Sequence, residues 1–119
     1  MFYLQLAGFG ALGILSRYFF GIVLSKYSFF PFSTLAVNII GAFLMGILFS
    51  TCDTPTDLHK AIAIGFLGGL TTFSSFSFES YQLWIKGEHL LFCLYFLGSP
   101  VLGLIGVIGG VSTGKLLNT

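Results

Sequence analysis

The stretch of the chain most able to do chemistry is residues 65–79, which read GFLGGLTTFSSFSFE within a long apolar segment. Adjacent glycines and adjacent threonines at 68–72 favour a helix that breaks there, because glycine permits backbone angles that other residues avoid and a threonine hydroxyl can satisfy a freed backbone group. Backbone groups freed by such a break commonly hold ions in membrane proteins. An unbroken helix that uses small residues for close packing is the alternative, and this stretch alone leaves both open.

Polar side chains within the apolar segments extend this pattern. Arg17 inside a membrane span costs about 2.5–3.5 kcal/mol on insertion scales, so it either lines water and attracts anions or reaches for the membrane surface. Thr34 and Asn38 lie one turn apart, and the Asn38 amide offers two donors and an acceptor, either to an ion and an interrupted backbone or to a neighbouring helix. Glu79 is the only acid within a span, and it either lines a vestibule or reaches the interface.

Aromatic rings and hydroxyl groups lie beside the expected break. Phe73 and Phe76 are interleaved with serines. The edges of phenylalanine rings carry positive potential, so these rings suit contact with a desolvated anion, and packing in the core is their alternative role. Tyr95 and Ser99 lie one turn apart in the last apolar segment, where Pro100 frees a backbone carbonyl. We therefore expect a polar path beside the second half of the broken helix.

The composition identifies the elements that must position these groups. The chain has 119 residues, a mean hydropathy of +0.98 and 8% charged residues, whereas a soluble domain has about 25%. We therefore expect an all-α integral membrane protein. A span needs about 20 mostly apolar residues, which places four helices near 3–24, 32–52, 59–84 and 89–115 in a single domain, 1–119. The net charge of +1 argues against nucleic acid as a partner.

The distribution of lysines does not favour one orientation of the chain in the membrane. An even number of spans places both termini on one side with Lys60 and Lys115, whereas Lys26 and Lys86 fall on the other side. Orientation normally follows the excess of Lys and Arg in cytoplasmic loops, and here the lysines balance. One expectation is insertion in both directions, with antiparallel pairing of two copies. A single orientation, decided by Arg17 or by the translation start, is the alternative.

The two cysteines fall at the end of the second expected span, Cys52, and just inside the fourth, Cys93. They should lie near opposite faces of a hydrocarbon core about 30 Å thick, whereas a disulfide needs Cα atoms within about 7 Å of each other. We therefore expect both thiols to be free.

Three motifs carry a resemblance to a known family. They are GxxGxxxRY at 10–18, TLxVNxxGxFxxG at 34–46 and GFxGGxTTFSxF at 65–76. With these motifs the chain resembles the Fluc family of fluoride channels, also called CrcB, over essentially its whole length. The third motif is specific to that family. Two positions depart from the family pattern: Gly103 stands where a polar side chain is usual, and Ser33 stands where glycine usually precedes Thr34.

The resemblance implies an antiparallel, dual-topology dimer with two pores that exports fluoride passively from a microbial cytoplasm and so protects against fluoride toxicity. It also implies a central structural sodium ion held by backbone carbonyls, which by motif position belong to Gly68 and Thr71. The implied partners are fluoride, sodium, membrane lipid and a second copy of the chain, and a different subunit of the same family is the alternative dimer partner. The implied pore and vestibule residues are Phe73, Phe76, Asn38, Thr34, Ser74, Ser75, Tyr95, Ser99 and Arg17.

Other functions fit the residues less well. A small dual-topology multidrug exporter has similar length and four spans, but it needs a protonatable acid deep in its first span, where this chain has none. A membrane scaffold that transports nothing would not require polar groups at mid-membrane. An enzyme would need a clustered nucleophile, base and orienting group, which the sequence does not suggest. His59 and His89 are isolated from other residues at metal-ligand spacing.

Overall fold

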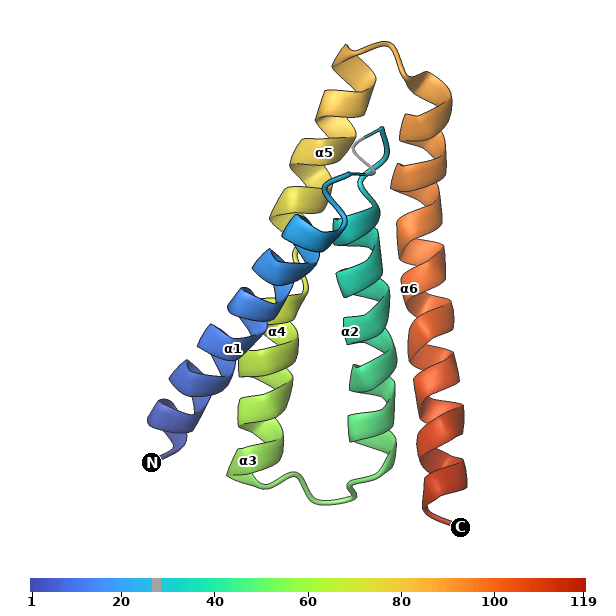
Figure 1. Cartoon of the computed structure of the whole chain (residues 1–119). Helices are drawn as coiled ribbons and strands as arrows, with labels where there is room; N and C mark the ends of the chain where they lie inside the picture. Colours follow the sequence, from blue (N-terminus) through green and yellow to red (C-terminus); the bar gives the residue numbers. More distant parts are fainter. Residues whose placement is uncertain (27–28) are drawn as a thin grey trace.

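The computed structural model describes residues 1–26 and 29–119, and over those residues its regular structure is entirely helical. Four helical segments are long and apolar enough to cross a membrane: α1 (Phe2–Val23), α2 (Phe32–Ser50), a compound third helix (Asp57–Ile85) and α6 (His89–Leu117) (Figure 1). Each end lies within two residues of the end expected from hydropathy. The prediction of a multi-pass membrane protein with four spans is confirmed.

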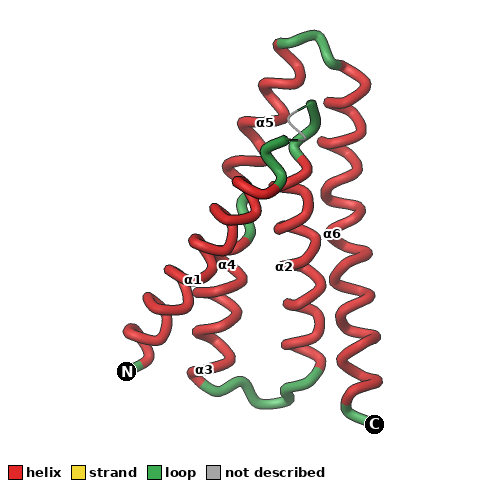
Figure 2. The backbone as a smooth tube through the Cα atoms, viewed as in Figure 1, coloured by secondary structure: helices red, strands yellow, loops and turns green. Residues whose placement is uncertain are grey.

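The third segment is a compound helix with a break near its centre. It runs through α3 (Asp57–Lys60), a π-helical stretch η1 (Ala61–Leu67), α4 (Gly68–Leu70) and α5 (Phe73–Ile85). Between α4 and α5 the backbone of Thr71 and Thr72 is extended, with ψ angles of 156° and 117°, and Figure 2 shows this interruption within the helix. The predicted break is confirmed, and it is confined to the two threonines.

The ends of the four spans are arranged as an even number of crossings requires. Both termini and α3 lie at one end of the molecule, and the α5–α6 connection lies at the other end (Figure 1). Cys52 follows α2 at the end with the termini, whereas Cys93 lies in the first turns of α6 at the far end. Both thiols are free, as expected.

Close helix crossings hold the broken helix against α1. A Cβ atom added at Gly65 would lie 2.7 Å from the Leu6 carbonyl oxygen, and one added at Gly69 would lie 2.7 Å from the Gly10 carbonyl oxygen. Only glycine allows the two backbones to approach so closely, as small residues do at membrane helix interfaces. The face of α1 that carries Gly10 therefore packs on η1 and α4 beside the break.

The second close pair is α2 with α6, which pack along their length. Glycines of α6 carry this contact, since a Cβ at Gly106 would lie 3.2 Å from the Ile39 carbonyl oxygen and one at Gly110 would overlap the backbone of Phe43. The pair formed by α1 with the broken helix contacts the pair formed by α2 and α6 where α2 approaches the break. This contact brings polar side chains of α1, α2, α5 and α6 together.

Candidate functional site

The Asn38 side chain pairs with the backbone at the helix break. Its Nδ2 donates to the Thr72 carbonyl at 3.1 Å, and its Oδ1 accepts from the Thr72 N–H at 2.8 Å. An extended residue in a membrane span lacks helical partners, and backbone groups there must be satisfied within the protein. Asn38 provides both partners from α2. The predicted polar face of the second span is thus directed at the break.

Two backbone carbonyls lose their helical donors as a result. In an uninterrupted helix the Gly68 carbonyl would accept from the Thr72 N–H, which instead donates to Asn38. The Thr71 carbonyl would accept from the Ser75 N–H, which instead donates to Thr72 Oγ1 at 3.2 Å as an N-terminal cap of α5. The resemblance implies a cation at the carbonyls of Gly68 and Thr71. At the break, both of these carbonyls lack the N–H donor that a continuous helix would provide.

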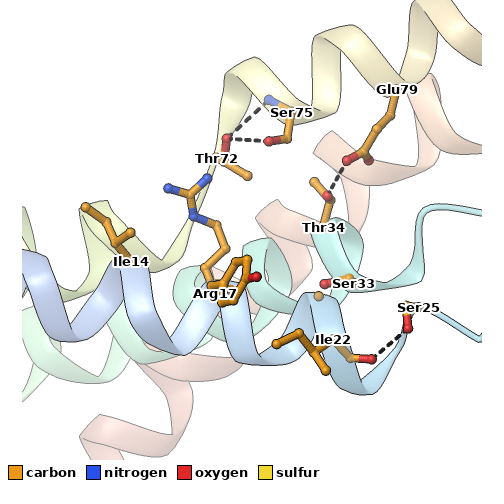
Figure 3. A pocket seen from close by; sticks show the side chains of 11 residues that line it. Ile14, Arg17, Ile22, Ser25, Ser33, Thr34, Thr72, Ser75 and Glu79 are labelled. Carbon is orange, nitrogen blue, oxygen red and sulfur yellow. Dashed lines mark hydrogen bonds between the residues drawn. The ribbon is translucent and has the colours of Figure 1, made fainter.

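A pocket of about 640 Å³ lies between α1, α2 and α5, and we call it the Arg17 pocket (Figure 3). Arg17 Nε donates to the Gly69 carbonyl at 3.0 Å, so the side chain is directed at the broken helix. Within the described part of the chain no carboxylate lies within 4 Å of its guanidinium. The residues that line the pocket are Ile14, Arg17, Tyr18, Gly21, Ile22, Ser25, Ser33, Thr34, Thr72, Ser75 and Glu79.

A second pocket, of about 410 Å³, adjoins the Arg17 pocket, and we call it the outer pocket. It extends to the connection between α5 and α6, where Lys86 and Glu88 line it. The two pockets share Gly21, Ser25, Ser33, Thr34 and Glu79. The two adjoining pockets, whose mixed linings include these polar groups, therefore form a route from one end of the bundle to Thr72.

Glu79 lies inside this route and lines both pockets. Its Oε1 accepts from the Thr34 hydroxyl at 2.7 Å, and its Oε2 accepts from the Tyr95 hydroxyl at 2.9 Å (Figure 3 shows the bond to Thr34). The carboxylate thus links α2, α5 and α6. From sequence, this acid could line a vestibule or reach the interface, and the structure places it among the lining residues. The hydroxyl hydrogens of Thr34 and Tyr95 are therefore both used in hydrogen bonds to the Glu79 carboxylate.

A third pocket lies on the other side of the break, and we call it the phenylalanine pocket. It has a volume of about 300 Å³. The Ser99 hydroxyl oxygen is buried there without a hydrogen-bond partner among the described residues. The rings of Phe73 and Phe76 lie 6.0 Å apart between centroids, and they differ greatly in exposure, at 79% and 8%. The lining residues are Asn38, Thr71, Thr72, Phe73, Phe76, Ser99 and Pro100.

The structure divides the residues that the sequence analysis grouped in one polar path. Asn38, Phe73, Phe76 and Ser99 line the phenylalanine pocket, whereas Arg17, Thr34 and Ser75 line the Arg17 pocket. The remaining two lie beside these sets: Tyr95 is buried with 1% exposure, and the Ser74 hydroxyl lies 3.2 Å from Thr72 Oγ1. A Cβ at Gly103 would meet open space.

Thr72 is the functional candidate that the sequence analysis missed. It lines both the Arg17 pocket and the phenylalanine pocket, and its hydroxyl caps α5. One signal was available in the sequence, since a threonine immediately before a helix start and three residues before a free N–H is a common N-cap. Its position between two pockets depends on the packing of α1 and α2 and has no such signal.

Fold and site together define a small polytopic membrane protein built around an interrupted helix, an arrangement typical of ion-transport proteins. The family model described as "CrcB-like protein, Camphor Resistance (CrcB)" matches residues 4–111. The chain belongs to this family, and the resemblance found in the sequence is confirmed.

Several named relatives align over almost the full chain. A protein of Geobacter sulfurreducens named "Fluoride-specific ion channel FluC" is 40% identical, over 96% of this chain and 97% of its own length. Proteins of the same name from Citrifermentans bemidjiense and Paracoccus denitrificans are 45% and 40% identical, over 91% and 95% of this chain and 92% and 94% of their own lengths. These relatives are named as ion channels and not as enzymes.

Proposed function

We propose that this chain forms a fluoride-selective channel that lets fluoride leave the cytoplasm passively and so protects the cell from fluoride toxicity. The observation that carries the proposal is the Thr71–Thr72 break, which separates a pocket with an arginine from a pocket with two phenylalanines. The names of the relatives supply the identity of the ion.

The proposed path runs from the outer pocket through the Arg17 pocket, past Thr72, to the phenylalanine pocket. Fluoride is small and tightly hydrated, so the protein must replace its water with hydrogen-bond donors. The Arg17 guanidinium keeps donors beyond the one used on Gly69 and raises the local concentration of anions. Beyond the break, the unpartnered Ser99 hydroxyl is available to donate, and the ring edges of Phe73 and Phe76 add positive potential.

The Glu79 carboxylate limits which hydroxyl groups along this path can bind fluoride. A carboxylate repels an anion, and here it holds the hydroxyl donors of Thr34 and Tyr95. Those two groups therefore serve fluoride only when the carboxylate releases them. Ser75, whose side chain lines the same pocket and accepts from Thr72 Oγ1 at 3.2 Å, keeps its own hydroxyl hydrogen for an anion.

We further propose that the carbonyls of Gly68 and Thr71 hold a structural sodium ion. Carbonyl oxygens are suitable ligands for such a hard cation, and these two lose their helical donors to Asn38 and Thr72. When bound, the ion supplies the positive partner that the two carbonyls lack at mid-membrane. Its chemistry is structural, and no step of conduction is assigned to it.

Two antiparallel copies are proposed as the working unit. The balanced lysines at the two ends of the bundle favour insertion in both directions. The 79% exposure of Phe73 beside the buried break also favours a second copy, because a pore residue exposed to lipid cannot line a closed path. A homodimer is the simplest assembly, and pairing with a related subunit is the alternative.

A multidrug exporter is the less favoured function. Exporters of this size require an acid deep in the first span, whereas the intramembrane acid here, Glu79, is on α5 and pairs with two hydroxyls.

The experiment is fluoride release from liposomes that contain the purified protein alone. We expect fluoride to leave rapidly once a counter-ion pathway is opened, while chloride stays inside. Equal release of chloride, or no release of fluoride, would remove the assignment. Release only after a related subunit is added would favour the heterodimer.

A further inference from the structure

A stack of three parallel aromatic rings connects α6 to the phenylalanine pocket. The rings of Phe92 and Phe96 lie 5.3 Å apart between centroids with an interplanar angle of 11°. The rings of Phe96 and Phe76 lie 5.9 Å apart at 9°. The three rings therefore share nearly one plane direction, in the offset parallel arrangement that aromatic pairs favour.

The other ring contacts of Phe76 are not parallel to this plane. Phe73 and Tyr95 lie near Phe76 with centroid distances of 6.0 and 5.1 Å, but their rings are tilted by 46° and 58°. The stack is fixed at its far end, since Trp84 packs on Phe92 at 5.2 Å in an edge contact. The two rings that are parallel to Phe76 thus lie on α6, away from the break.

We propose that Phe96 is a positioning residue for conduction: its ring fixes the plane in which Phe76 faces the phenylalanine pocket. This inference rests on the proposed channel function. Phe96 is outside the set of residues that line the pocket and is 46% exposed, so it acts through Phe76 and does not contact the ion.

The orientation of the Phe76 ring matters because its electrostatics change sign with direction. The face of the ring is negative and the edge is positive. A ring that keeps its plane presents the same group to every passing anion, whereas a ring that tilts presents a negative face for part of the time. Loss of the Phe96 ring therefore raises the barrier for anions without removing any pore-lining atom.

The test compares three single variants in the liposome assay. Phe96→Leu removes the ring and keeps an apolar side chain, and we expect fluoride flux to fall about two- to tenfold, the change that corresponds to an aromatic pair of about 0.5–1.5 kcal/mol. Phe96→Tyr keeps the ring and should restore most of the flux. Phe78→Leu makes the same change at an α5 side chain that is 61% exposed, and it should conduct like the wild-type protein.

Each outcome decides the inference. No fluoride flux in the wild-type protein would reject the channel function itself. Wild-type flux in Phe96→Leu, or equal losses in Phe96→Leu and Phe96→Tyr, would reject the positioning role and leave the channel function intact. If Phe96→Leu does not assemble, Phe96→Met, which fills similar space without a ring, takes its place with the same expected loss.

Discussion

Substitution of Asn38 tests whether one side chain maintains the helix break. Asn38→Leu keeps a similar volume and removes both hydrogen bonds to Thr72, of 2.8 and 3.1 Å. Thr72 is 9% exposed, which restricts the access of water to the groups that lose their partners. A buried polar group left unpaired costs about 1–3 kcal/mol, which gives about 2–6 kcal/mol for the two groups. Measured hydrogen bonds between membrane helices average about 0.6 kcal/mol, which sets a lower bound of about 1 kcal/mol.

The assay is unfolding of the detergent-solubilised protein by titration with a denaturing detergent, together with fluoride flux. Asn118→Leu is the matched control, because Asn118 Nδ2 also donates to a backbone carbonyl, that of Ser50 at 3.1 Å, but in an exposed position at the end of α6. We expect Asn38→Leu to lose about 1–6 kcal/mol more than the control and to lose fluoride flux. The released Thr72 N–H can regain a partner by returning to the Gly68 carbonyl, and that would close the break.

Asn38→Asp keeps the acceptor and changes the donor. An ionised aspartate accepts from the Thr72 N–H but cannot donate to the Thr72 carbonyl, and its charge within a span costs about 2.5–3.5 kcal/mol. A protonated carboxyl both donates and accepts, so we expect a stability loss that becomes smaller as the pH is lowered. Unchanged stability and unchanged flux in Asn38→Leu would refute the reasoning, since the break would then persist without its side-chain partner.

Four further perturbations test other parts of the site. Phe76→Ile keeps apolar volume and removes the ring edge, so fluoride flux should fall severely while the protein elutes in size-exclusion measurements like the wild type. A Cβ at Gly41 would overlap the Thr71 methyl group; Gly41→Ala should abolish flux, and adding Thr71→Ser, which removes that methyl, should restore it. Glu79→Ala leaves the hydroxyls of Thr34 and Tyr95 unpaired and should lower the unfolding free energy by about 1–6 kcal/mol, the range expected for two lost hydrogen bonds. Single cysteines placed in the α1–α2 and α2–α3 connections should both be labelled from outside intact cells, and labelling of only one would end the antiparallel model.

Hydropathy was sufficient to predict the four spans, because a helix that crosses the membrane must be apolar over a fixed length. The break was also predictable, since Gly68, Gly69, Thr71 and Thr72 are poor choices for an uninterrupted helix. The π-helical stretch before it was not predicted. Residues 61–67 have no composition that distinguishes a π-helix from an α-helix, and the close crossing with α1 is a tertiary contact.

The division of the site into two pockets was also beyond sequence reasoning, for a geometric reason. Helical spacing assigns residues to faces only while the helix is continuous. The extended backbone at Thr71 and Thr72 changes the direction of α5 relative to α4, so faces counted across the break do not correspond. Ser75 and Phe76 are adjacent in sequence and line different pockets. The position of Glu79 required the packing of three helices, whose contacts the chain order does not reveal.

The hydrogen bonds at the break connect the proposed cation site to the proposed anion path. Asn38 takes the N–H that would otherwise serve the Gly68 carbonyl, and the same side chain lines the phenylalanine pocket. Thr72 takes the N–H that would otherwise serve the Thr71 carbonyl, and it lines the pockets on both sides of the break. A substitution at Asn38 or Thr72 therefore alters both sites at once. Only residues that belong to one site, such as Gly68 for the cation and Phe76 for the anion, can separate loss of the cation from loss of conduction.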